Sequence, residues 1–235
     1  MKYPISIKLG NRYTFKYIVF RIFTSMGTLL LVRHGETEWN AEGRIQGHTD
    51  IGLSEKGAEQ ARSLGQRLVD LRIDAAYSSD LKRTSETAKL ALGDRNLVLN
   101  KTPELREYHK GIFEGMTLGE IQAQYPEEYP KYLEKDLSYA PKGGETTRDV
   151  SIRMASIIGD IKAKHMDETV LVVSHGGVLR AAMVFLLGME LESNWSFVFG
   201  NCSLTIVNTF ADNTVLRLFN DTSHMMGTVH HGMTG

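Results

Sequence analysis

Two uninterrupted apolar runs constrain the fold of this chain more than any other feature. The sequences TLLLV at residues 28–32 and TVLVV at residues 169–173 are each short enough for one strand, and neither alternates with polar residues. A strand that is apolar on both faces is typical of a parallel sheet covered by helices on each side. The two runs therefore predict a buried α/β sheet.

Helix-like and strand-like segments alternate along the rest of the chain. Apolar residues at helical spacing mark the helices, and short apolar runs mark the strands. We expect helices over residues 54–71, 79–92, 146–164 and 177–187, with Ser54 and Ser79 as caps of the first two, and further strands over residues 75–78, 96–100, 204–210 and 215–219. This alternation predicts a three-layer α/β/α fold with a mostly parallel central sheet.

Three regions depart from the alternation. Residues 108–144 hold three of the five prolines and five of the nine tyrosines, which favours a helical insertion that caps the site as a lid. Residues 1–25 hold five basic residues and no acidic one. We interpret them as a disordered extension, or as a segment outside the native protein if it starts at Met26, in preference to a targeting segment. Residues 26–224 are predicted to form a single domain, and residues 225–235 a flexible tail.

Composition excludes several classes of partner. The formal net charge is −1, from 27 basic and 28 acidic side chains, which predicts no nucleic-acid and no membrane partner. Any anion site must therefore be local. Cys202 is the single cysteine, so no internal disulfide can form. We expect it to be a buried apolar residue of a cytoplasmic protein.

Both apolar runs end in a histidine that is followed by glycine. The first continues as RHGETEWN and the second as SHGGVLR. Ligands of parallel α/β sheets bind outside the carboxyl ends of the strands, so we expect His34 and His175 to face each other there. Gly35, Gly176 and Gly177 permit close backbone approach, and helix N-termini favour an anion. The pattern predicts an anion site at this sheet edge.

Two further segments supply charged candidates. In YSSDLKRTSETA, Arg83 lies near a helix N-terminus, where the helix dipole disfavours a cation unless a bound dianion reverses the balance. The alternative is a surface arginine paired with Asp80 or Glu86. In ELREYHKGIFEG, one of several carboxyl groups could act as an acid, and the residues alone do not choose among the three: Glu104, Glu107 and Glu114.

Six segments in this order resemble the histidine phosphatase superfamily, the phosphoglycerate mutase-like group. They are RHGETEWN, GRIQGHTDIGLSEKG, YSSDLKRTSETA, LREYHKGIFEG, GGET and VVSHGG, and the resemblance extends over residues 28–219. It implies that His34 is the nucleophile that takes the phosphoryl group, that His175 contacts the same group, and that Glu107 is the acid and base. It also implies a set of phosphate-binding residues: Arg33, Arg83, Asn40, Gln46 and Gly176.

The chemistry of phosphoryl transfer explains why ionisable residues end an apolar strand. His34 must be unprotonated to attack phosphorus, and two flanking arginines should lower its pKa below the ordinary value of about 6.5. Its other ring nitrogen then needs an acceptor, which we expect to be a nearby backbone carbonyl. Arginine and histidine donors can neutralise the phosphoryl oxygens, so we expect neither a metal nor a cofactor.

These considerations predict a metal-independent phosphomonoester hydrolase that acts through a phosphohistidine on small phosphorylated metabolites. The spacing of 68 positions between Glu107 and His175 resembles the phosphatase branch, because mutases usually carry a longer insertion there. The alternative is a 2,3-bisphosphoglycerate-dependent phosphoglycerate mutase, and a further one is a catalytically silent phospho-ligand binder. The expected partner is a small-molecule phosphate ester, and the oligomeric state, including a homodimer, stays open.

The remaining histidines offer a rival reading as a metal hydrolase. No HExxH or CxxC motif supports it. His48, His109 and His165 are expected on the surface or in loops, although His109 is close enough to Glu107 to face a substrate. His224 is kept as a weak candidate for closing the site. The pair at 230–231 is expected to lie in an unstructured tail.

Overall fold

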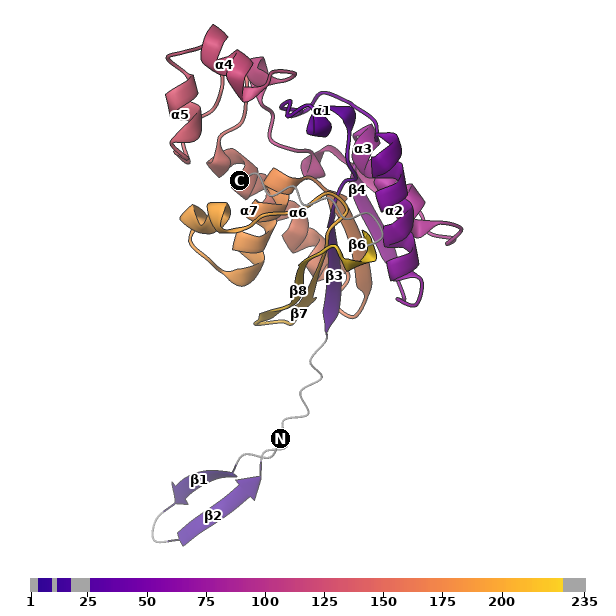
Figure 1. Ribbon diagram of the computed structural model, residues 1–235. Coiled ribbons are helices and arrows are strands. Elements are labelled where there is room, and N and C mark those ends of the chain that lie inside the picture. The colour runs from indigo at the N-terminus through magenta and orange to yellow at the C-terminus, as the bar shows by residue number, and fades with distance from the viewer. Residues whose placement is uncertain (1–3, 10–11, 18–25, 226–235) are drawn as a thin grey trace.

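The computed structural model describes residues 4–9, 12–17 and 26–225 (Figure 1). Strands β1 (Pro4–Leu9) and β2 (Arg12–Tyr17) pair with each other antiparallel in a sheet of their own. Nothing in the structure tests the predicted extension at residues 1–25 or the single domain at 26–224, and the predicted tail lies almost wholly outside the described residues. These divisions of the chain stay predictions.

The central sheet has six strands in the order β5-β4-β6-β3-β7-β8. The strands are β3 (Gly27–Arg33), β4 (Ala75–Ser79), β5 (Leu99–Thr102), β6 (Thr169–Ser174), β7 (Leu204–Thr209) and β8 (Thr214–Asp221). The first four in this order are parallel, and β7 and β8 add an antiparallel edge. The mostly parallel sheet predicted from the sequence is therefore confirmed.

Helices cover both faces of this sheet, as the apolar strands require (Figure 1). Leu30 and Val32 of β3 pack into one core with helices α2 (Glu55–Leu68) and α3 (Lys82–Leu92). Leu29 and Leu31 point the other way, toward helices α6 (Thr147–Lys164) and α7 (Gly176–Leu187). Each fully buried Leu or Val side chain contributes about 1.5–3 kcal/mol, so β3 stabilises both layers.

Two helix caps were predicted at serines, and one of them is wrong. Ser54 caps α2, since its hydroxyl accepts a hydrogen bond from the backbone N–H of Gly57 at 3.1 Å. Ser79, however, remains the last residue of β4, and α3 begins three positions later behind Leu81, which gives no side-chain cap. The hydroxyl of Ser79 instead contacts His175, as described below.

The expected insertion is helical, and its helices are short. It contains the 3-10 turn η2 (Gly111–Phe113) and helices α4 (Leu118–Gln124) and α5 (Tyr129–Leu133). These helices lie beyond the carboxyl end of β3, on the same side as α1 (Glu38–Ala41) (Figure 1). The other short turns are η1 (Pro103–Leu105), η3 (Leu191–Ser196) and η4 (Ser223–Met225). The insertion therefore stands over the edge where the sequence predicts a site.

The loop after β3 is clamped against the first turn of α2. The backbone N–H of Ser54 donates to the carbonyl of Glu36 at 2.9 Å, and that of Gly35 donates to the hydroxyl of Thr87 at 2.9 Å. A Cβ at Gly57 would lie 2.0 Å from the carbonyl oxygen of Glu36, and one at Gly35 would lie 2.5 Å from that of Gly57. Only glycine permits this approach.

We expect the Gly57→Ala variant to destabilise the protein, because the added methyl group overlaps backbone that cannot move without shifting the His34 loop. Such overpacking costs roughly 1–3 kcal/mol, which lowers the melting temperature by several degrees in a domain of this size, about 2–4 °C per kcal/mol. Gly119→Ala in α4 is the matched control, since its Cβ would meet nothing closer than the hydroxyl of Thr117 at 4.0 Å. Thermal denaturation with equal melting temperatures for the two variants would contradict the clamp.

Candidate active site

His34 leaves the end of β3 with its ring orientation set by the backbone. Its Nδ1 lies 2.7 Å from the carbonyl oxygen of Gly35, and its backbone N–H donates to the carbonyl of Ser174 at 2.9 Å. A carbonyl can only accept, so Nδ1 carries the proton and Nε2 keeps its lone pair. The imidazole lines the cavity described below and is 3% exposed. The predicted carbonyl acceptor is therefore confirmed as Gly35.

Several effects hold the pKa of His34 well below 6.5. Burial is the largest, because it disfavours the charged form, and the positive charges of Arg33 and Arg83 act in the same direction. The hydrogen bond to Gly35 opposes them only in part. The sequence predicts the effect of the arginines, but the tertiary structure adds the larger contribution from burial.

His175 lies beside His34, as the two apolar runs predict. The ring centroids are 5.2 Å apart, since β3 and β6 are neighbours with Arg33 in register with Ser174. The Nδ1 atom of His175 accepts from Nε of Arg83 at 3.2 Å, and its Nε2 donates to the hydroxyl of Ser79 at 2.8 Å. Burial, followed by the charge of Arg83, lowers the pKa of His175 well below 6.5. Both imidazoles are therefore neutral in the free protein near neutral pH.

Arg83 is fully buried, and its predicted alternative as a surface ion pair is wrong. Its guanidinium donates to the carbonyl oxygens of Thr49 at 2.8 Å and Gly47 at 2.7 Å, besides His175. The two carboxylates considered as partners are engaged elsewhere: Asp80 with Arg106 and Glu86 with the backbone of Leu53. Burial lowers the pKa of Arg83 to about 10, so it stays charged at neutral pH.

Arg33 supplies the second buried guanidinium. Its Nη1 donates to the carbonyl of Phe199 at 2.6 Å, but its Nε is buried without a hydrogen-bond partner among the described residues. A buried, unpaired donor of this kind costs about 1–3 kcal/mol or more, since the group is charged. Arg33 and Arg83 both line the cavity and neither forms an ion pair within the described part of the chain. An anion in the cavity would satisfy both.

The other predicted phosphate-binding residues reach the same cavity, which is lined by Asn40, Gln46 and Gly176. The Oδ1 atom of Asn40 accepts from the backbone N–H of Thr37 at 3.2 Å, which leaves the Nδ2 group to donate. Gly176 is the first residue of α7, and a Cβ there would lie 3.3 Å from Arg33. The structure thus brings all the predicted site residues together; the role of each stays a prediction.

The structure selects among the three glutamates of the 104–115 loop. Glu107 lines the cavity, where one carboxylate oxygen accepts from the backbone N–H of Gly177 at 3.0 Å and the other from that of Tyr108 at 2.9 Å. Glu114 instead holds three backbone N–H groups of the surrounding loops, and Glu104 is exposed. A Cβ at Gly177 would lie 2.5 Å from a carboxylate oxygen of Glu107, so a larger residue there would displace that carboxylate.

The remaining histidines support the site or lie outside it. His48 contacts the carbonyl of Glu107 at 2.8 Å, and His109 packs edge-on against His48 with centroids 4.7 Å apart. His109 is not among the cavity-lining residues, so the suggestion that it faces a substrate is not supported. His224 contacts the carbonyl of Cys202. His165 is buried against Tyr77, and the pair at 230–231 lies outside the described residues.

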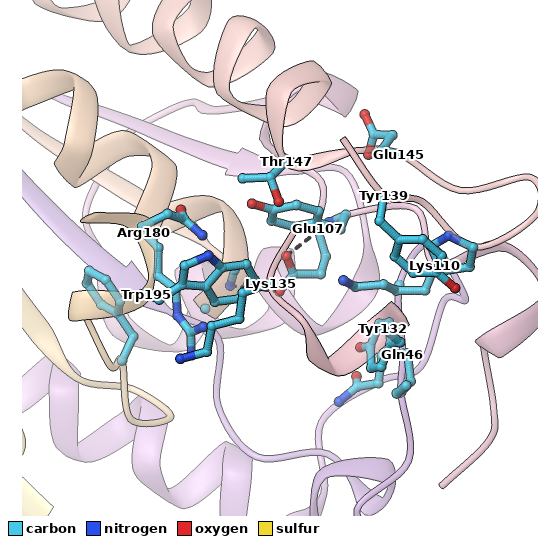
Figure 2. A pocket seen from close by; sticks show the side chains of 18 of the residues that line it. Gln46, Glu107, Lys110, Tyr132, Lys135, Tyr139, Glu145, Thr147, Arg180 and Trp195 are labelled. Atoms are coloured by element: carbon cyan, nitrogen blue, oxygen red, sulfur yellow. Dashed lines mark hydrogen bonds between the residues drawn. The ribbon is translucent and has the colours of Figure 1, made fainter. Parts of the chain in front are cut away.

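The cavity encloses about 500 Å³ between the sheet edge and the insertion. Its outer wall carries residues that sequence reasoning did not assign individually. They are Tyr108 and, labelled in Figure 2, Lys110, Tyr132, Tyr139, Arg180 and Trp195. Sequence reasoning also missed the contact of Ser79 with His175, although the adjacent serines that end β4 were a signal. In the described ranges, no group of three His, Cys, Asp or Glu side chains is arranged to hold a metal, and no helix is both long and apolar enough to cross a bilayer.

This fold, with two guanidiniums and the imidazole of His34 lining one cavity and the neutral imidazole of His175 packed directly behind them, defines a class of phosphate-handling α/β enzymes. The chain belongs to the histidine phosphatase superfamily, branch 1, whose sequence model matches residues 29–222. It is therefore a phosphatase of the histidine phosphatase type.

Several relatives are similar over most of their length. Phosphoserine phosphatase 1 of Hydrogenobacter thermophilus is 36% identical over 85% of this chain and 95% of its own, and the metal-independent phosphoserine phosphatase of Arabidopsis thaliana is 34% identical over 92% and 91%. A 2,3-bisphosphoglycerate-dependent phosphoglycerate mutase of Bartonella henselae is 34% identical over 80% and 95%. The solved structure of Bacillus stearothermophilus YhfR superposes with a TM-score of 0.79, at 36% identity over 85% and 99%.

The lowered pKa of His34 predicts a distinctive titration. An ordinary histidine gains its proton near pH 6.5, whereas His34 should stay neutral at about pH 6 in the free protein. In the unfolded chain the same ring is protonated there, so the free energy of unfolding should fall as the pH drops below about 6.5. Histidine ring resonances recorded by NMR, with the His34→Asn variant for assignment, measure this directly. Titration of His34 at about pH 6.5 would show that the burial and the arginines do not act as described.

Proposed function

We propose that this chain is a metal-independent phosphomonoester hydrolase that forms a phosphohistidine on His34 and acts on small phosphorylated metabolites. The observation that carries the proposal is the unprotonated Nε2 of a buried His34 between two guanidiniums, with Glu107 lining the same cavity. A nucleophile, an anion site and an acid or base are then all present. The expected partner is a small phosphate ester, and the expected setting is the cytoplasm.

In the first step of the proposed mechanism, Nε2 of His34 attacks phosphorus. The bond between phosphorus and the ester oxygen breaks, and the leaving oxygen takes a proton from the carboxyl group of Glu107. In the second step, Glu107 takes a proton from water, the resulting hydroxide attacks phosphorus, and the P–N bond breaks to release inorganic phosphate. The free imidazole of His34 and the protonated carboxyl group of Glu107 are both regenerated.

Electrostatics support this sequence of steps. The transition state spreads negative charge over three oxygens, and Arg33, Arg83 and the N-terminus of α7 supply donors that are already in place. A bound dianion would also favour protonation of His175, which burial and the charge of Arg83 otherwise oppose. Removing one preorganised donor typically costs about 3 kcal/mol, or roughly a hundredfold in rate.

A phosphoglycerate mutase is the second candidate, because relatives with that name match nearly as much of the chain. The hydrolase is preferred for two reasons. The segment between Glu107 and His175 is only 68 positions long, and the Arabidopsis thaliana relative that is similar over 92% of this chain is named a metal-independent phosphoserine phosphatase. A catalytically silent binder would lack a nucleophile, an arginine or an acid, and this chain has all three.

Glu107→Gln should accumulate the phosphohistidine from p-nitrophenyl phosphate, because p-nitrophenolate leaves without a proton from Glu107 whereas the amide cannot take a proton from the attacking water. With ³²P-labelled p-nitrophenyl phosphate in excess EDTA, we expect acid-labile label on the variant and steady phosphate release by the unaltered protein. Glu104→Gln is the control, since Glu104 is exposed and outside the cavity. Absence of label together with rescue of activity by zinc or magnesium would instead support a metal hydrolase.

Hydrolase and mutase make different products from 3-phosphoglycerate. The hydrolase should release inorganic phosphate whether or not 2,3-bisphosphoglycerate is present, because water reaches the phosphohistidine. A coupled assay for 2-phosphoglycerate, run beside a phosphate assay, separates the two. Formation of 2-phosphoglycerate that depends on added 2,3-bisphosphoglycerate, without phosphate release, would establish the mutase.

A further inference from the structure

Two partly buried cations of the cavity wall remain unused after the phosphate is bound. Arg33 and Arg83 suffice for one phosphoryl dianion, yet Lys110 and Arg180 line the same space. Neither forms an ion pair with a described carboxylate. Figure 2 shows their side chains on opposite sides of Glu107. Positive charge therefore continues past the catalytic end of the cavity.

The surroundings of Lys110 are aromatic. Its ammonium lies 4.5 Å from the ring centroid of Tyr108 and 5.4 Å from that of Tyr132. Ring faces attract a cation but do not replace a hydrogen-bond acceptor or a counter-charge. Burial lowers the pKa of Lys110 and the charge of Arg180 lowers it further, whereas the charges of Glu107, Glu145 and Glu114 raise it only in part and none of them forms an ion pair with the ammonium. The ammonium lacks the partner that would offset its burial.

Arg180 projects from α7 into the same space. Its guanidinium carbon lies 5.9 Å from the ring centroid of Trp195, and its Nε is buried with no hydrogen-bond partner among the described residues. Buried guanidinium donors in folded proteins are almost always paired. By contrast, Lys131 also lines the cavity but is bound to Glu128 at 2.8 Å. The unpaired state therefore does not apply to every cation of the wall. Lys135 also lines the cavity without an ion pair to a described residue, but it is exposed, whereas Lys110 and Arg180 are partly buried.

The carboxylates of the wall do not supply the missing charge. Glu145 is held by Arg153 at 2.8 Å and by the backbone N–H of His109. Asp136 accepts from the backbone of Ser138. Glu107 accepts from two backbone N–H groups and must be protonated, and therefore uncharged, before it acts as an acid. The counter-charge for Lys110 and Arg180 must come from the ligand.

We propose that Lys110 and Arg180 form a subsite for a second anionic group of the substrate, so that the preferred substrates are short phosphate esters that also carry a carboxylate. The inference rests on the proposed phosphatase function for its kinetic test. The phosphate would lie against His34 and the ester oxygen near Glu107. The carboxylate would lie beyond it, between the ammonium and the guanidinium, with the aromatic rings excluding water.

The kinetic test compares two substrates that differ only in the carboxylate. O-Phosphoserine and O-phosphoethanolamine share the phosphate and the ammonium group, so the ratio of their kcat/KM values isolates the carboxylate. Lys110→Met keeps the apolar stem against the tyrosine rings, and Arg180→Gln keeps a polar group. We expect each substitution to lower the ratio about 10- to 100-fold, the usual worth of a charge-assisted hydrogen bond. Lys131→Met is the control. The native ammonium of Lys131 is already paired with Glu128, so this substitution should leave the ratio unchanged.

A binding measurement separates failure of the subsite from failure of the proposed activity. Titration calorimetry with 3-phosphoglycerate and glycerol 3-phosphate uses the same contrast, a carboxylate against a hydroxymethyl group, and needs no turnover. Weaker binding of 3-phosphoglycerate alone in the two variants supports the subsite even if the protein proves catalytically silent. The proposed subsite would be overturned if each variant lost the same affinity for both ligands, or if the ratio of kcat/KM values for O-phosphoserine and O-phosphoethanolamine were unaltered in both variants. If the unaltered protein bound 2,3-bisphosphoglycerate more tightly than 3-phosphoglycerate, and both variants lost that difference, the subsite would be one for a second phosphate and the carboxylate proposal would be wrong.

Discussion

Burial of positive charge at the carboxyl edge of a parallel sheet is the constraint on which the rest of this structure depends. Arg33 and Arg83 are held by backbone carbonyls, and no described carboxylate pairs with either one. Carbonyl dipoles orient the guanidiniums without cancelling their charge. The same charge, together with burial, keeps His34 and His175 neutral. The free site thus carries positive charge without a counter-charge among the described residues, and we propose that a phosphate dianion supplies it.

Rigid local contacts in the scaffold hold these buried charged and polar groups in place. Parallel pairing of β3 with β6 sets the two imidazoles 5.2 Å apart. Glycines at 57 and 177 let α2 press on the His34 loop and let α7 press on Glu107. The hydrogen bonds of His34 to Gly35 and of His175 to Ser79 set the tautomers. Little reorganisation is then needed when a ligand binds, which is the condition under which electrostatic catalysis is efficient.

The insertion divides the site into two parts with different tasks. The sheet edge holds the residues that we propose to contact phosphorus or its oxygens, while the 108–144 segment contributes tyrosines and Lys110 to the outer wall. Phe113 anchors this segment through contacts with the rings of Tyr125 and Tyr132. Tyrosines of this segment therefore both pack its helices and line the cavity. Membership of a superfamily whose relatives differ in named substrate fits this division, because the wall can change while the edge stays the same.

The sequence by itself determined the parallel sheet, the meeting of His34 with His175 and the family, because apolar runs and short motifs are local signals that read directly along the chain. Three points could not be predicted from the residues alone: which glutamate of the 104–115 loop lines the cavity, the contact of Ser79 with His175, and the pairing of Asp80 with Arg106. Only the tertiary structure decided those points, and only it revealed that Lys110 and Arg180 share one cavity without a counter-charge. The physical reason is that burial and charge pairing depend on neighbours from distant segments, and no local pattern encodes which of them will be adjacent.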